Sequence, residues 1–431
     1  MGDVSTTVIQ PAKNVSGSLR VPGDKSISHR YAMLAAISEG KSQLENFSTG
    51  ADCASTLECL RQLGAPAQRH DTKVEIEGRG SALHTPTAAL DCGNSGSTMR
   101  MLAGILAGQP FTTELAGDES LSRRPMQRIV APLTEMGASI LSDEKFRPPL
   151  RIKGGTLHGI SYRMPVASAQ VKSCVLFAGL LAKGETRIEE PIRTRDHGEL
   201  ALQAFGAELE RSGNQHSIRG PQRLHAITAT IPGDISSAAF FLCAAALFPD
   251  ANLIIDGVGL NPTRAAILDF LRALGLRITV MQVEEHNGEV LGTLRVQGGG
   301  KLGGGRVAGR QTADMIDELP VLAAIAPYTR EGIEIRDARE LRVKESDRIA
   351  SMASNLRAFG AEVEILEDGL RIPGGQQLHG AELDSFGDHR IAMAGAITAL
   401  RAKGATSIRN SGVVDISYPG FFSTLETLVE R

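Results

Sequence analysis

The stretch GDKSISHRYAMLAA, residues 23–36, sets the pattern on which the fold depends. A short polar cluster leads directly into an alanine-rich apolar run, and Asp24 stands where a helix N-cap is expected. Helix N-termini attract anions, because their backbone N–H groups lack partners and the helix dipole is positive there. Five similar openings follow at intervals of roughly seventy residues. They are Gly93-Asn94-Ser95-Gly96, Ser168-Ala169-Gln170, Gly233-Asp234-Ile235-Ser236, Ile316-Asp317-Glu318 and Gly387-Asp388-His389-Arg390. The chain is therefore predicted to hold a highly anionic ligand.

The six openings belong to a longer internal repeat. After each alanine-rich helix comes a strand-like run, such as Thr186-Arg187-Ile188-Glu189, and then a second helix. Alternating apolar and polar residues after the second helix predict a hairpin. Five of the second helices run into a glycine, the residue that favours the left-handed conformation ending a helix. These glycines are Gly64, Gly137, Gly206, Gly275 and Gly360. We expect an α/β (α+β) fold of six similar copies.

The sixth copy predicts how the domains are arranged. Its last helix, 422–431, ends the chain without a hairpin, whereas residues 7–10 and 18–21 look like the missing pair of strands. Three copies would make one domain, and Pro-Gly pairs at 22–23 and 232–233 are typical of crossings between domains. We predict a discontinuous domain of residues 1–21 plus 235–431 and an inserted domain of residues 22–234.

The composition limits the classes of function. The chain has 431 residues, a net charge of −3 and no Trp, which argues against a broad nucleic-acid surface. Its five cysteines lack the paired spacing of a metal site and are expected to be buried reduced thiols. No secretion signal is visible, and the longest apolar run, 235–248, is shorter than the roughly 20 residues that span a bilayer. We expect a soluble, cytoplasmic protein with no metal and with neither a nucleic-acid nor a membrane partner.

The first opening carries the strongest local signal for a binding site. Lys25, Ser26 and Arg30 fall in the first turns of the predicted helix, where positive side chains oppose the helix dipole. Such a placement is unfavourable unless an anion binds there. We therefore favour an anion-binding site over a solvated basic helix end. The spacing of a Walker phosphate loop is absent.

A second set of polar loops precedes the second helix of several copies. For residues 261–264 we favour a solvated charged helix start. Around Glu345 three cations lie close in sequence, so its carboxyl group is a candidate acid whose pKa substrate or burial could tune. Asp317 is a second candidate, with a simple N-cap as the alternative, and His389 could equally be a cap partner. The loops are Arg123-Arg124-Pro125-Met126, Arg193-Thr194-Arg195-Asp196-His197, Asn261-Pro262-Thr263-Arg264 and Arg342-Val343-Lys344-Glu345-Ser346-Asp347-Arg348.

Seven motifs in order resemble the 5-enolpyruvylshikimate-3-phosphate (EPSP) synthase family across essentially the whole chain, closest to its second bacterial class. They are residues 23–30, 93–100, 124–126, 168–170, 316–318, 344–348 and 388–390. The resemblance implies the enolpyruvyl transferase fold, an inside-out α/β barrel: two domains, each with three βαβαββ repeats, and an active site in the cleft between them. It also implies transfer of the enolpyruvyl group of phosphoenolpyruvate to shikimate 3-phosphate through a tetrahedral intermediate, without a cofactor, in the shikimate pathway of aromatic amino acid biosynthesis.

The resemblance also implies roles for individual residues. Lys25, Asp317 and Glu345 would be catalytic, with Asp317 as the base for the 5-hydroxyl group and Glu345 exchanging the proton at the methylene carbon of phosphoenolpyruvate. The residues implied to bind shikimate 3-phosphate are Lys25, Ser26, Arg30, Ser168, Ala169, Gln170, Arg195, Asp317 and Lys344. The residues implied to bind phosphoenolpyruvate are Lys25, Asn94, Gly96, Arg124, Gln170, Arg348 and Arg390.

Three positions depart from the better-known class of the family. Ser97 and Ala169 resemble the second bacterial class, whereas Ile416 stands where the better-known class has a substrate-binding Lys. Gly96 leaves the phosphoenolpyruvate site sterically open, a site at which the inhibitor glyphosate competes in this family. The expected partners are therefore the two small-molecule substrates and this inhibitor, bound to a monomer.

Two alternative functions stay open at this point. The first is the sister enolpyruvyl transferase that acts on UDP-N-acetylglucosamine, but the loop of residues 111–124 lacks the reactive Cys typical of that enzyme. The second is a nucleic-acid-end-processing repeat protein, against which the negative net charge argues.

Overall fold

The computed structural model describes residues 5–300 and 302–431, so the first four residues of the predicted discontinuous domain and Lys301 lie outside the described part. The chain forms two compact units. Unit 1 contains the N-terminal segment up to Pro22 together with Pro232–Glu284 and Val290–Arg431. Unit 2 contains Gly23–Ile231 and the five-residue segment Glu285–Glu289, for which the sequence gives no signal.

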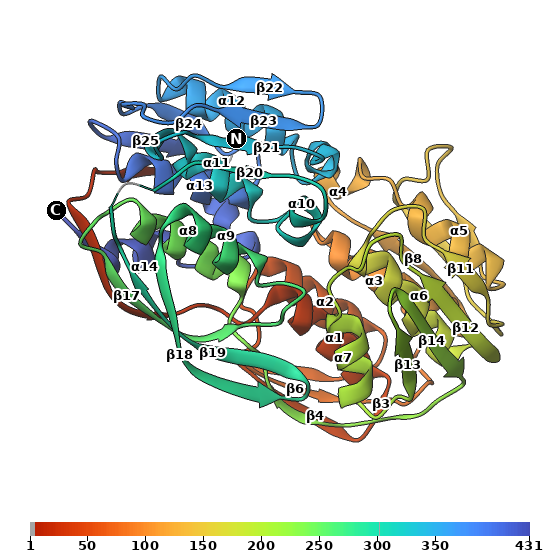
Figure 1. Ribbon diagram of the computed structural model, residues 1–431. Helices are drawn as coiled ribbons and strands as arrows, with labels where there is room; N and C mark the ends of the chain where they lie inside the picture. Colours follow the sequence, from red (N-terminus) through yellow and green to blue (C-terminus); the bar gives the residue numbers. More distant parts are fainter. Residues whose placement is uncertain (1–4, 301) are drawn as a thin grey trace. The chain divides into compact units, whose positions relative to one another are not determined.

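Unit 2 contains three copies of one supersecondary motif (Figure 1). Each copy places a parallel strand beside the strand that follows its first helix, and an antiparallel hairpin completes a four-stranded sheet. The first copy has α1 (Lys25–Ala36), β4 (Lys41–Glu45), α2 (Ala51–Gln62), β5 (Ala67–His70) and β6 (Lys73–Glu77), and takes its parallel strand, β16 (Thr228–Thr230), from the end of the unit. The second has β7 (Leu90–Asp91), α3 (Gly96–Ala107), β8 (Thr112–Ala116), α4 (Glu119–Ser122), α5 (Gln127–Glu135), β9 (Ser139–Leu141) and β10 (Leu150–Lys153). The third has β11 (Ser161–Arg163), α6 (Ala169–Leu181), β12 (Gly184–Glu189), α7 (His197–Ala204), β13 (Leu209–Ser212) and β14 (Gln215–Gly220), and a small separate sheet pairs β3 (Ser38–Glu39) with β15 (Leu224–His225).

Unit 1 repeats the same order of elements. Its first copy has β2 (Asn14–Arg20), α8 (Ile235–Ala246), β17 (Asn252–Gly259), α9 (Ala266–Leu274), β18 (Arg277–His286) and β19 (Glu289–Gln297), and the tip of the β18–β19 hairpin is the segment assigned to unit 2. The second has β20 (Gly305–Val307), α10 (Arg310–Asp314), α11 (Leu319–Ile325), the 3₁₀ turns η1 (Ala326–Tyr328) and η2 (Arg339–Val343), β21 (Ile333–Ile335), α12 (Arg348–Ala358), β22 (Glu364–Leu366) and β23 (Gly369–Ile372). The third has β24 (Glu382–Asp384), α13 (His389–Ala399), β25 (Thr406–Arg409), η3 (Ser411–Ile416), α14 (Phe421–Leu428) and β26 (Val429–Glu430), with β1 (Thr6–Ile9) paired to β25.

The predicted N-terminal hairpin is only half right. β1 pairs antiparallel with β25 and extends the sixth copy, but β2 pairs parallel with β17, with Leu19 opposite Ile255. Alternation of apolar and polar residues predicts that a segment is a strand, but it does not predict which strand lies beside it. Here the pairing of β2 is set by the burial of Val15 and Leu19 in the core of unit 1. The C-terminal helix also ends earlier than predicted, because Val429–Glu430 pair with β2 as a short strand.

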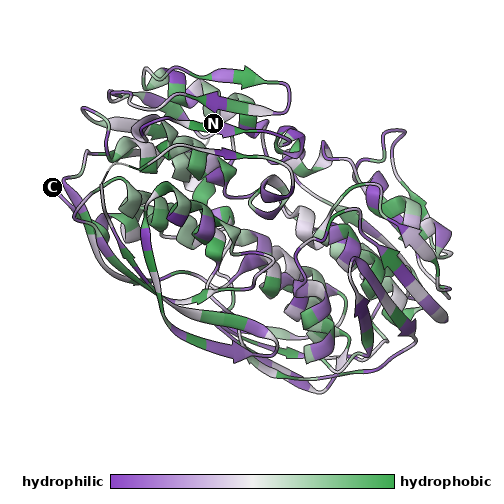
Figure 2. Cartoon of the chain, in the orientation of Figure 1, coloured by the Kyte–Doolittle hydropathy of each residue, from purple (hydrophilic) through white to green (hydrophobic). Residues whose placement is uncertain are grey.

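The alanine-rich helices form the interior of each unit. Ten of the twelve residues of α1 and eleven of the twelve of α8 are buried. For the mostly apolar α8 this burial is expected, whereas α1 also buries the polar side chains of Ser28, His29 and Arg30. Each unit has its own hydrophobic core. Figure 2 shows hydrophobic residues concentrated on the helices and hydrophilic residues along exposed strands such as β18. The small alanine side chains allow these helices to approach one another closely, so that their first turns can share side-chain contacts.

Most of the predicted helix starts and stops are confirmed. Asp24, Ser168, Asp234 and Asp388 each cap a helix through a side-chain oxygen, and in the second copy the cap is Ser95, one residue after Asn94. All five predicted stop glycines have positive φ values, between 85° and 109°. The five cysteines are buried and free, as expected. In the described part of the chain no helix has the length and apolar character needed to cross a membrane.

Candidate active site

The first turn of α1 places a buried cation beside a carboxylate. The Asp24 side chain accepts a hydrogen bond from the backbone N–H of Ile27 at 2.9 Å and so fixes the helix start. The Lys25 ammonium lies 2.9 Å from the Asp52 carboxylate, and both side chains are largely buried. Asp52 opens α2, so this pair joins the first turns of two helices.

Arg30 connects α1 to α6. Its guanidinium donates to Ser173 Oγ at 3.1 Å, to the backbone carbonyl of Ser26 at 2.9 Å and to that of Ala169 at 3.3 Å. Burial lowers the pKa of Arg30 to about 10; the charges of Glu199 and Asp24 oppose this shift, and the positive charge of Arg195 adds to it. Arg30 therefore stays charged at neutral pH, with a second guanidinium close enough to repel it. An anion between the two would relieve this repulsion.

Gln170 connects α6 to α3, which lie side by side (Figure 1). Its amide nitrogen donates to Ser97 Oγ at 2.8 Å, and its amide oxygen accepts from Arg100 Nη1 at 2.8 Å. Ser168 caps α6 by accepting from the backbone N–H of Val171. Together with Arg30, Gln170 links the first turns of α1, α3 and α6 by side-chain hydrogen bonds.

Arg124, in the loop before α5, contacts the residues that precede α3. Its guanidinium donates to Asn94 Oδ1 at 2.7 Å and to Ser120 Oγ at 3.2 Å, and Asn94 donates to Asp118 at 2.7 Å. A Cβ atom added at Gly96 would lie 3.0 Å from Arg100 Nη1 and 3.4 Å from Arg124 Nη1. The absence of a side chain at residue 96 therefore keeps open the space beside two guanidinium groups.

A second cluster in unit 1 is centred on Arg348, whose side chain is almost fully buried. It donates to Asp388 Oδ2 at 2.8 Å and to Glu345 Oε2 at 2.6 Å, and its Nη1 lies 3.6 Å from Asp317 Oδ1. Burial alone would lower the pKa of Arg348, but the charges of Asp388, Glu345 and Asp317 raise it above its ordinary value. Within the described residues Nη1 donates no hydrogen bond, although it is buried.

Two more cations contact Asp317 in the same unit. Lys344 Nζ lies 3.8 Å from Asp317 Oδ1, and Arg390 donates to the backbone carbonyl of Asp317 at 2.7 Å. Asp317 precedes Glu318, the residue at the N-cap position of α11, so the N-cap alternative for Asp317 is wrong. Its carboxylate is instead placed between charged groups of the η2–α12 segment.

The three cations of residues 342–348 are distributed over three carboxylates. Arg348 pairs with Glu345, Lys344 lies nearest Asp317, and Arg342 donates to Asp347 at 2.8 Å. Asp347 also caps α12 by accepting from the backbone N–H of Ala350. The loop geometry thus directs Lys344, Glu345 and Arg348 to one cluster, while Arg342 supports the helix start.

The prediction of a solvated helix start at residues 261–264 is wrong. Asn261 and Arg264 are buried, and Arg264 Nη1 donates to both oxygens of Glu318 at 2.9 Å. Arg264 also donates to Ser236 Oγ. The reason is a partner 54 residues away in sequence, which local composition cannot reveal. This pair anchors the residue that follows Asp317.

The structure assigns the predicted site residues to two sets. The set in unit 2 consists of Lys25, Ser26, Arg30, Asn94, Gly96, Arg124, Ser168, Ala169, Gln170 and Arg195. The set in unit 1 consists of Asp317, Lys344, Glu345, Arg348 and Arg390. Four residues that contact predicted site residues were missed in the sequence, namely Asp52, Arg100, Ser173 and Asp388. Of these, Arg100 and Asp388 lie within predicted motifs and could have been found, whereas Asp52 and Ser173 give no local signal.

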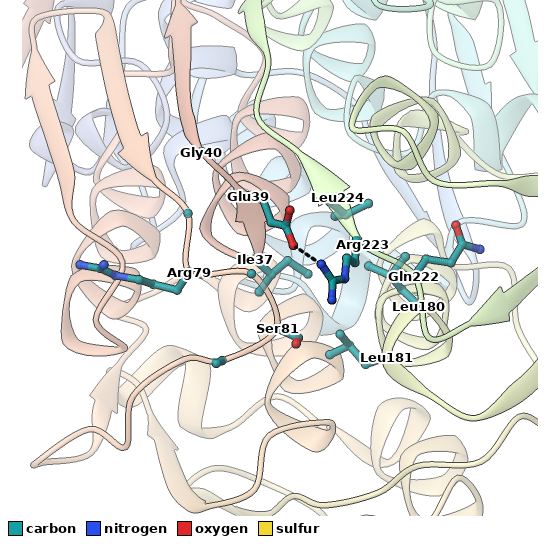
Figure 3. A pocket seen from close by; sticks show the side chains of 13 residues that line it. Ile37, Glu39, Gly40, Arg79, Ser81, Leu180, Leu181, Gln222, Arg223 and Leu224 are labelled. Carbon is teal, nitrogen blue, oxygen red and sulfur yellow. Dashed lines mark hydrogen bonds and ion pairs between the residues drawn. The ribbon is translucent and has the colours of Figure 1, made fainter.

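A separate hollow in unit 2 contains none of the predicted site residues. It is lined by Glu39, the glycine-rich loop of residues 78–82, the end of α6 and the segment 222–224 (Figure 3). Arg223 reaches into it and donates to Glu39 at 3.2 Å, an ion pair that is largely exposed. Such an exposed pair contributes little to stability, and the hollow contains no predicted site residue, so it is not part of the candidate site.

A buried network of four charged side chains, which we call the Lys172 network, lies in the third copy of unit 2. Lys172 Nζ is 2.8 Å from both Glu190 Oε1 and Glu199 Oε1. His216 Nε2 is 2.9 Å from Glu190 Oε1, and its Nδ1 is 3.4 Å from Glu199 Oε1. Burial on its own would raise the pKa of Glu190, but the hydrogen bond from His216 and the charge of Lys172 outweigh it and lower this pKa to about 2.

The lowered pKa of Glu190 predicts that the protein loses stability at acidic pH. Because the folded-state pKa of Glu190 lies below its ordinary value of 4.5, its stabilising contribution is complete above pH 4.5 and is lost as the pH falls toward 2. The contribution is about 3 kcal/mol. Urea unfolding measured from pH 6 to pH 3 should show a shallower acid dependence in Glu190→Gln than in the wild type. The exposed Glu208→Gln serves as control, and identical pH slopes in all three proteins would contradict the prediction.

The chain is similar to known proteins over nearly its full length. A model of the family "EPSP synthase (3-phosphoshikimate 1-carboxyvinyltransferase)" matches residues 9–425. The 3-phosphoshikimate 1-carboxyvinyltransferase of Koribacter versatilis is 61% identical over 424 residues, covering 98% of this chain and 99% of the relative. The enzyme of the same name from Solibacter usitatus is 53% identical over 423 residues, with the same coverage.

The solved structures include the same family. A structure of EPSP synthase from Acinetobacter baumannii superimposes with a TM-score of 0.88 at 39% identity, covering 99% of this chain and 98% of that one. The fold is therefore that of the two-domain enolpyruvyl transferases, as the resemblance implied. The chain belongs to the EPSP synthase (3-phosphoshikimate 1-carboxyvinyltransferase) family.

Proposed function

We propose that the chain transfers the enolpyruvyl group of phosphoenolpyruvate to the 5-hydroxyl group of shikimate 3-phosphate and releases phosphate. Family membership over nearly the full chain supports this activity. The observation that carries it is the linkage of three helix N-termini, those of α1, α3 and α6, through Arg30 and Gln170. Helix N-termini and buried cations in one place stabilise phosphate and carboxylate groups.

The shikimate 3-phosphate site is assigned mainly to unit 2. Arg30 and Arg195 would hold the phosphate group, because the charge of Arg195 acts on Arg30 and two guanidinium groups this close suit a single anion. Lys25, Ser26 and the first turn of α6, Ser168-Ala169-Gln170, would complete the site. From unit 1, Asp317 and Lys344 would bind the hydroxyl groups of the ring.

The phosphoenolpyruvate site is assigned to cations of both sets. Arg124, Lys25 and the amide groups of Asn94 and Gln170 would bind it from unit 2, with Gly96 leaving room for the ligand. From unit 1, Arg348 and Arg390 would contribute. Nη1 of Arg348 supports this role, because among the described residues it has an ion-pair contact with Asp317 but donates no hydrogen bond. Arginine is suited to both groups, because its planar fork binds phosphate and carboxylate with two parallel hydrogen bonds.

Two carboxylates would move protons in this scheme. Asp317 would accept the proton of the 5-hydroxyl group as its oxygen bonds to C2 of phosphoenolpyruvate, while Glu345 delivers a proton to C3. Removal of a C3 proton by Glu345 and cleavage of the C2–O bond to phosphate would then restore the double bond. Fixed cations would stabilise the charge that develops, without a cofactor. We further propose that both sets serve one active site of a cytoplasmic monomer, and that glyphosate competes for the phosphoenolpyruvate site.

The deciding experiment measures phosphate release with both substrates present and with each one omitted. Turnover that requires phosphoenolpyruvate and shikimate 3-phosphate together supports the proposal. Turnover with UDP-N-acetylglucosamine in place of shikimate 3-phosphate would overturn it. Binding of single-stranded RNA at moderate salt, with no phosphate release from any substrate pair, would instead favour a nucleic-acid function.

Gly96→Ala is predicted to weaken phosphoenolpyruvate binding selectively. The added methyl group would stand 3.0 Å from Arg100 Nη1 and 3.4 Å from Arg124 Nη1, which displaces one or both guanidinium groups. Overpacking of this kind costs about 1–3 kcal/mol, so KM for phosphoenolpyruvate should rise roughly 10- to 100-fold while KM for shikimate 3-phosphate stays nearly constant. Gly155→Ala is the matched control, because a Cβ atom there meets no neighbour within 4 Å. Equal increases in both KM values would contradict the assignment.

A further inference from the structure

The Lys172 network closes the loop that carries Arg195. Glu190 Oε1 accepts from Lys172, while its second oxygen, Oε2, accepts from the backbone N–H of Thr194 at 3.0 Å and from the Thr194 hydroxyl group. The Glu190 carboxylate therefore closes the turn from residue 190 to residue 194 and also ties this turn to Lys172. Arg195 follows directly, so the direction in which it leaves the loop is set by this turn.

The same network reaches the first turn of α6. The backbone N–H of Lys172 donates to the carbonyl of Ser168, the N-cap residue, at 3.0 Å. The next residue, Ser173, accepts from Arg30 Nε, and α7 packs so closely here that a Cβ atom at Gly198 would lie 2.4 Å from Ser173 Oγ. Glu199, in the first turn of α7, completes the connection through its ion pair with Lys172. Arg30, α6 and the Arg195 loop are thus joined by buried polar contacts.

The ammonium group of Lys172 distinguishes this network from a metal site. The ligand atoms of Glu190, Glu199 and His216 all lie within 4.8 Å of one another, a grouping able to hold a metal ion. The Lys172 ammonium already lies 2.8 Å from both carboxylates and supplies the positive charge. Because this charge is attached to α6, the two carboxylates are tied to that helix rather than to a diffusible ion.

We propose that Lys172, Glu190, Glu199 and His216 are positioning residues that set the affinity for the phosphate group of shikimate 3-phosphate. They hold Arg195 at a fixed place relative to Arg30 and the first turn of α6, without touching the substrate themselves. The inference rests on the proposed function, since it concerns one substrate of that reaction.

Thr194→Val tests the link between the network and the loop. The variant removes the hydroxyl donor to Glu190 and keeps the shape of the side chain. KM and Kd for shikimate 3-phosphate should rise about tenfold, the effect of one hydrogen bond to a charged group, while KM for phosphoenolpyruvate and kcat change less than twofold. Thr194→Ser should behave as the wild type. Thr186→Val is the matched control on β12, because among the described residues the buried Thr186 hydroxyl has no hydrogen-bond partner.

A second variant tests the network itself while keeping its net charge. Lys172→Gln combined with Glu199→Gln removes one positive and one negative charge and keeps the Glu190–His216 pair. A selective rise in KM for shikimate 3-phosphate, with faster amide hydrogen exchange in residues 193–196, supports the proposal. Folded variants with an unchanged KM for shikimate 3-phosphate, or with equal changes in both KM values, would overturn it. A wild type that fails to turn over shikimate 3-phosphate would refute the proposed function instead, so the two failures are distinguishable.

Discussion

Glu345→Gln should lower kcat by about 10²- to 10⁴-fold, the usual contribution of a positioned acid or base, while both substrates still bind. The amide has nearly the same shape as the carboxyl group, so it can occupy the same place beside Arg348. It cannot deliver a proton to C3 of phosphoenolpyruvate or remove one. The loss should therefore fall on the chemical step and leave substrate affinity almost unchanged.

The measurement is steady-state phosphate release together with Kd values for shikimate 3-phosphate. Glu382→Gln, at an exposed position of the same unit, provides the control and should keep wild-type kcat. A Glu345→Gln enzyme with wild-type kcat and a raised KM for phosphoenolpyruvate would show that Glu345 binds substrate rather than moves protons.

Arg348→Met should destabilise the protein by about 3–5 kcal/mol, because removal of one partner leaves buried carboxylates without a counter-charge. Asp388 is fully buried and loses both guanidinium hydrogen bonds, and Glu345 loses its contact at 2.6 Å. Arg348→Lys restores the charge but not the planar fork that serves two carboxylates. It should regain part of the stability, while kcat/KM for phosphoenolpyruvate stays well below the wild-type value.

Urea unfolding and the kinetic constants together test this prediction. Arg371→Met is the matched control, because Arg371 also pairs with two carboxylates, Glu334 and Glu364, but about half of its side chain is exposed. Exposed pairs contribute about 0–1 kcal/mol, so this variant should lose little. Equal destabilisation by both Met variants would mean that burial does not determine the strength of the Arg348 cluster.

Local signals in the sequence predicted the repeat and the ends of its helices. A polar cap followed by an apolar run needs only neighbouring residues, as Asp24 and Ser168 show, and Gly275 ends its helix with a φ of 109°. The predictions of helix ends succeeded because the physical cause lies within a few residues of the feature. The same logic led to the anion site at Lys25 and Arg30, which stays a prediction.

Features that depend on distant partners could not be predicted in this way. The pairing of β2 with β17 joins segments more than two hundred residues apart, and the Arg264–Glu318 pair spans 54 residues. Arg264 looked solvated because its partner is not nearby in sequence. The Lys172 network likewise takes its four members from α6, the end of β12, α7 and β14, so no single stretch of sequence reveals it.

The burial of all five cysteines has a practical consequence for biophysical work. Burial raises the pKa of Cys53 to about 12, and it also raises the pKa values of Cys174 and Cys243. Thiolates are the species that react with maleimides and with oxidants, so these side chains should stay inert in the native protein. One cysteine introduced on the surface of each unit would then accept a fluorophore selectively, with every native thiol left in place. The wild-type sequence is thus already a suitable background for distance measurements between labels.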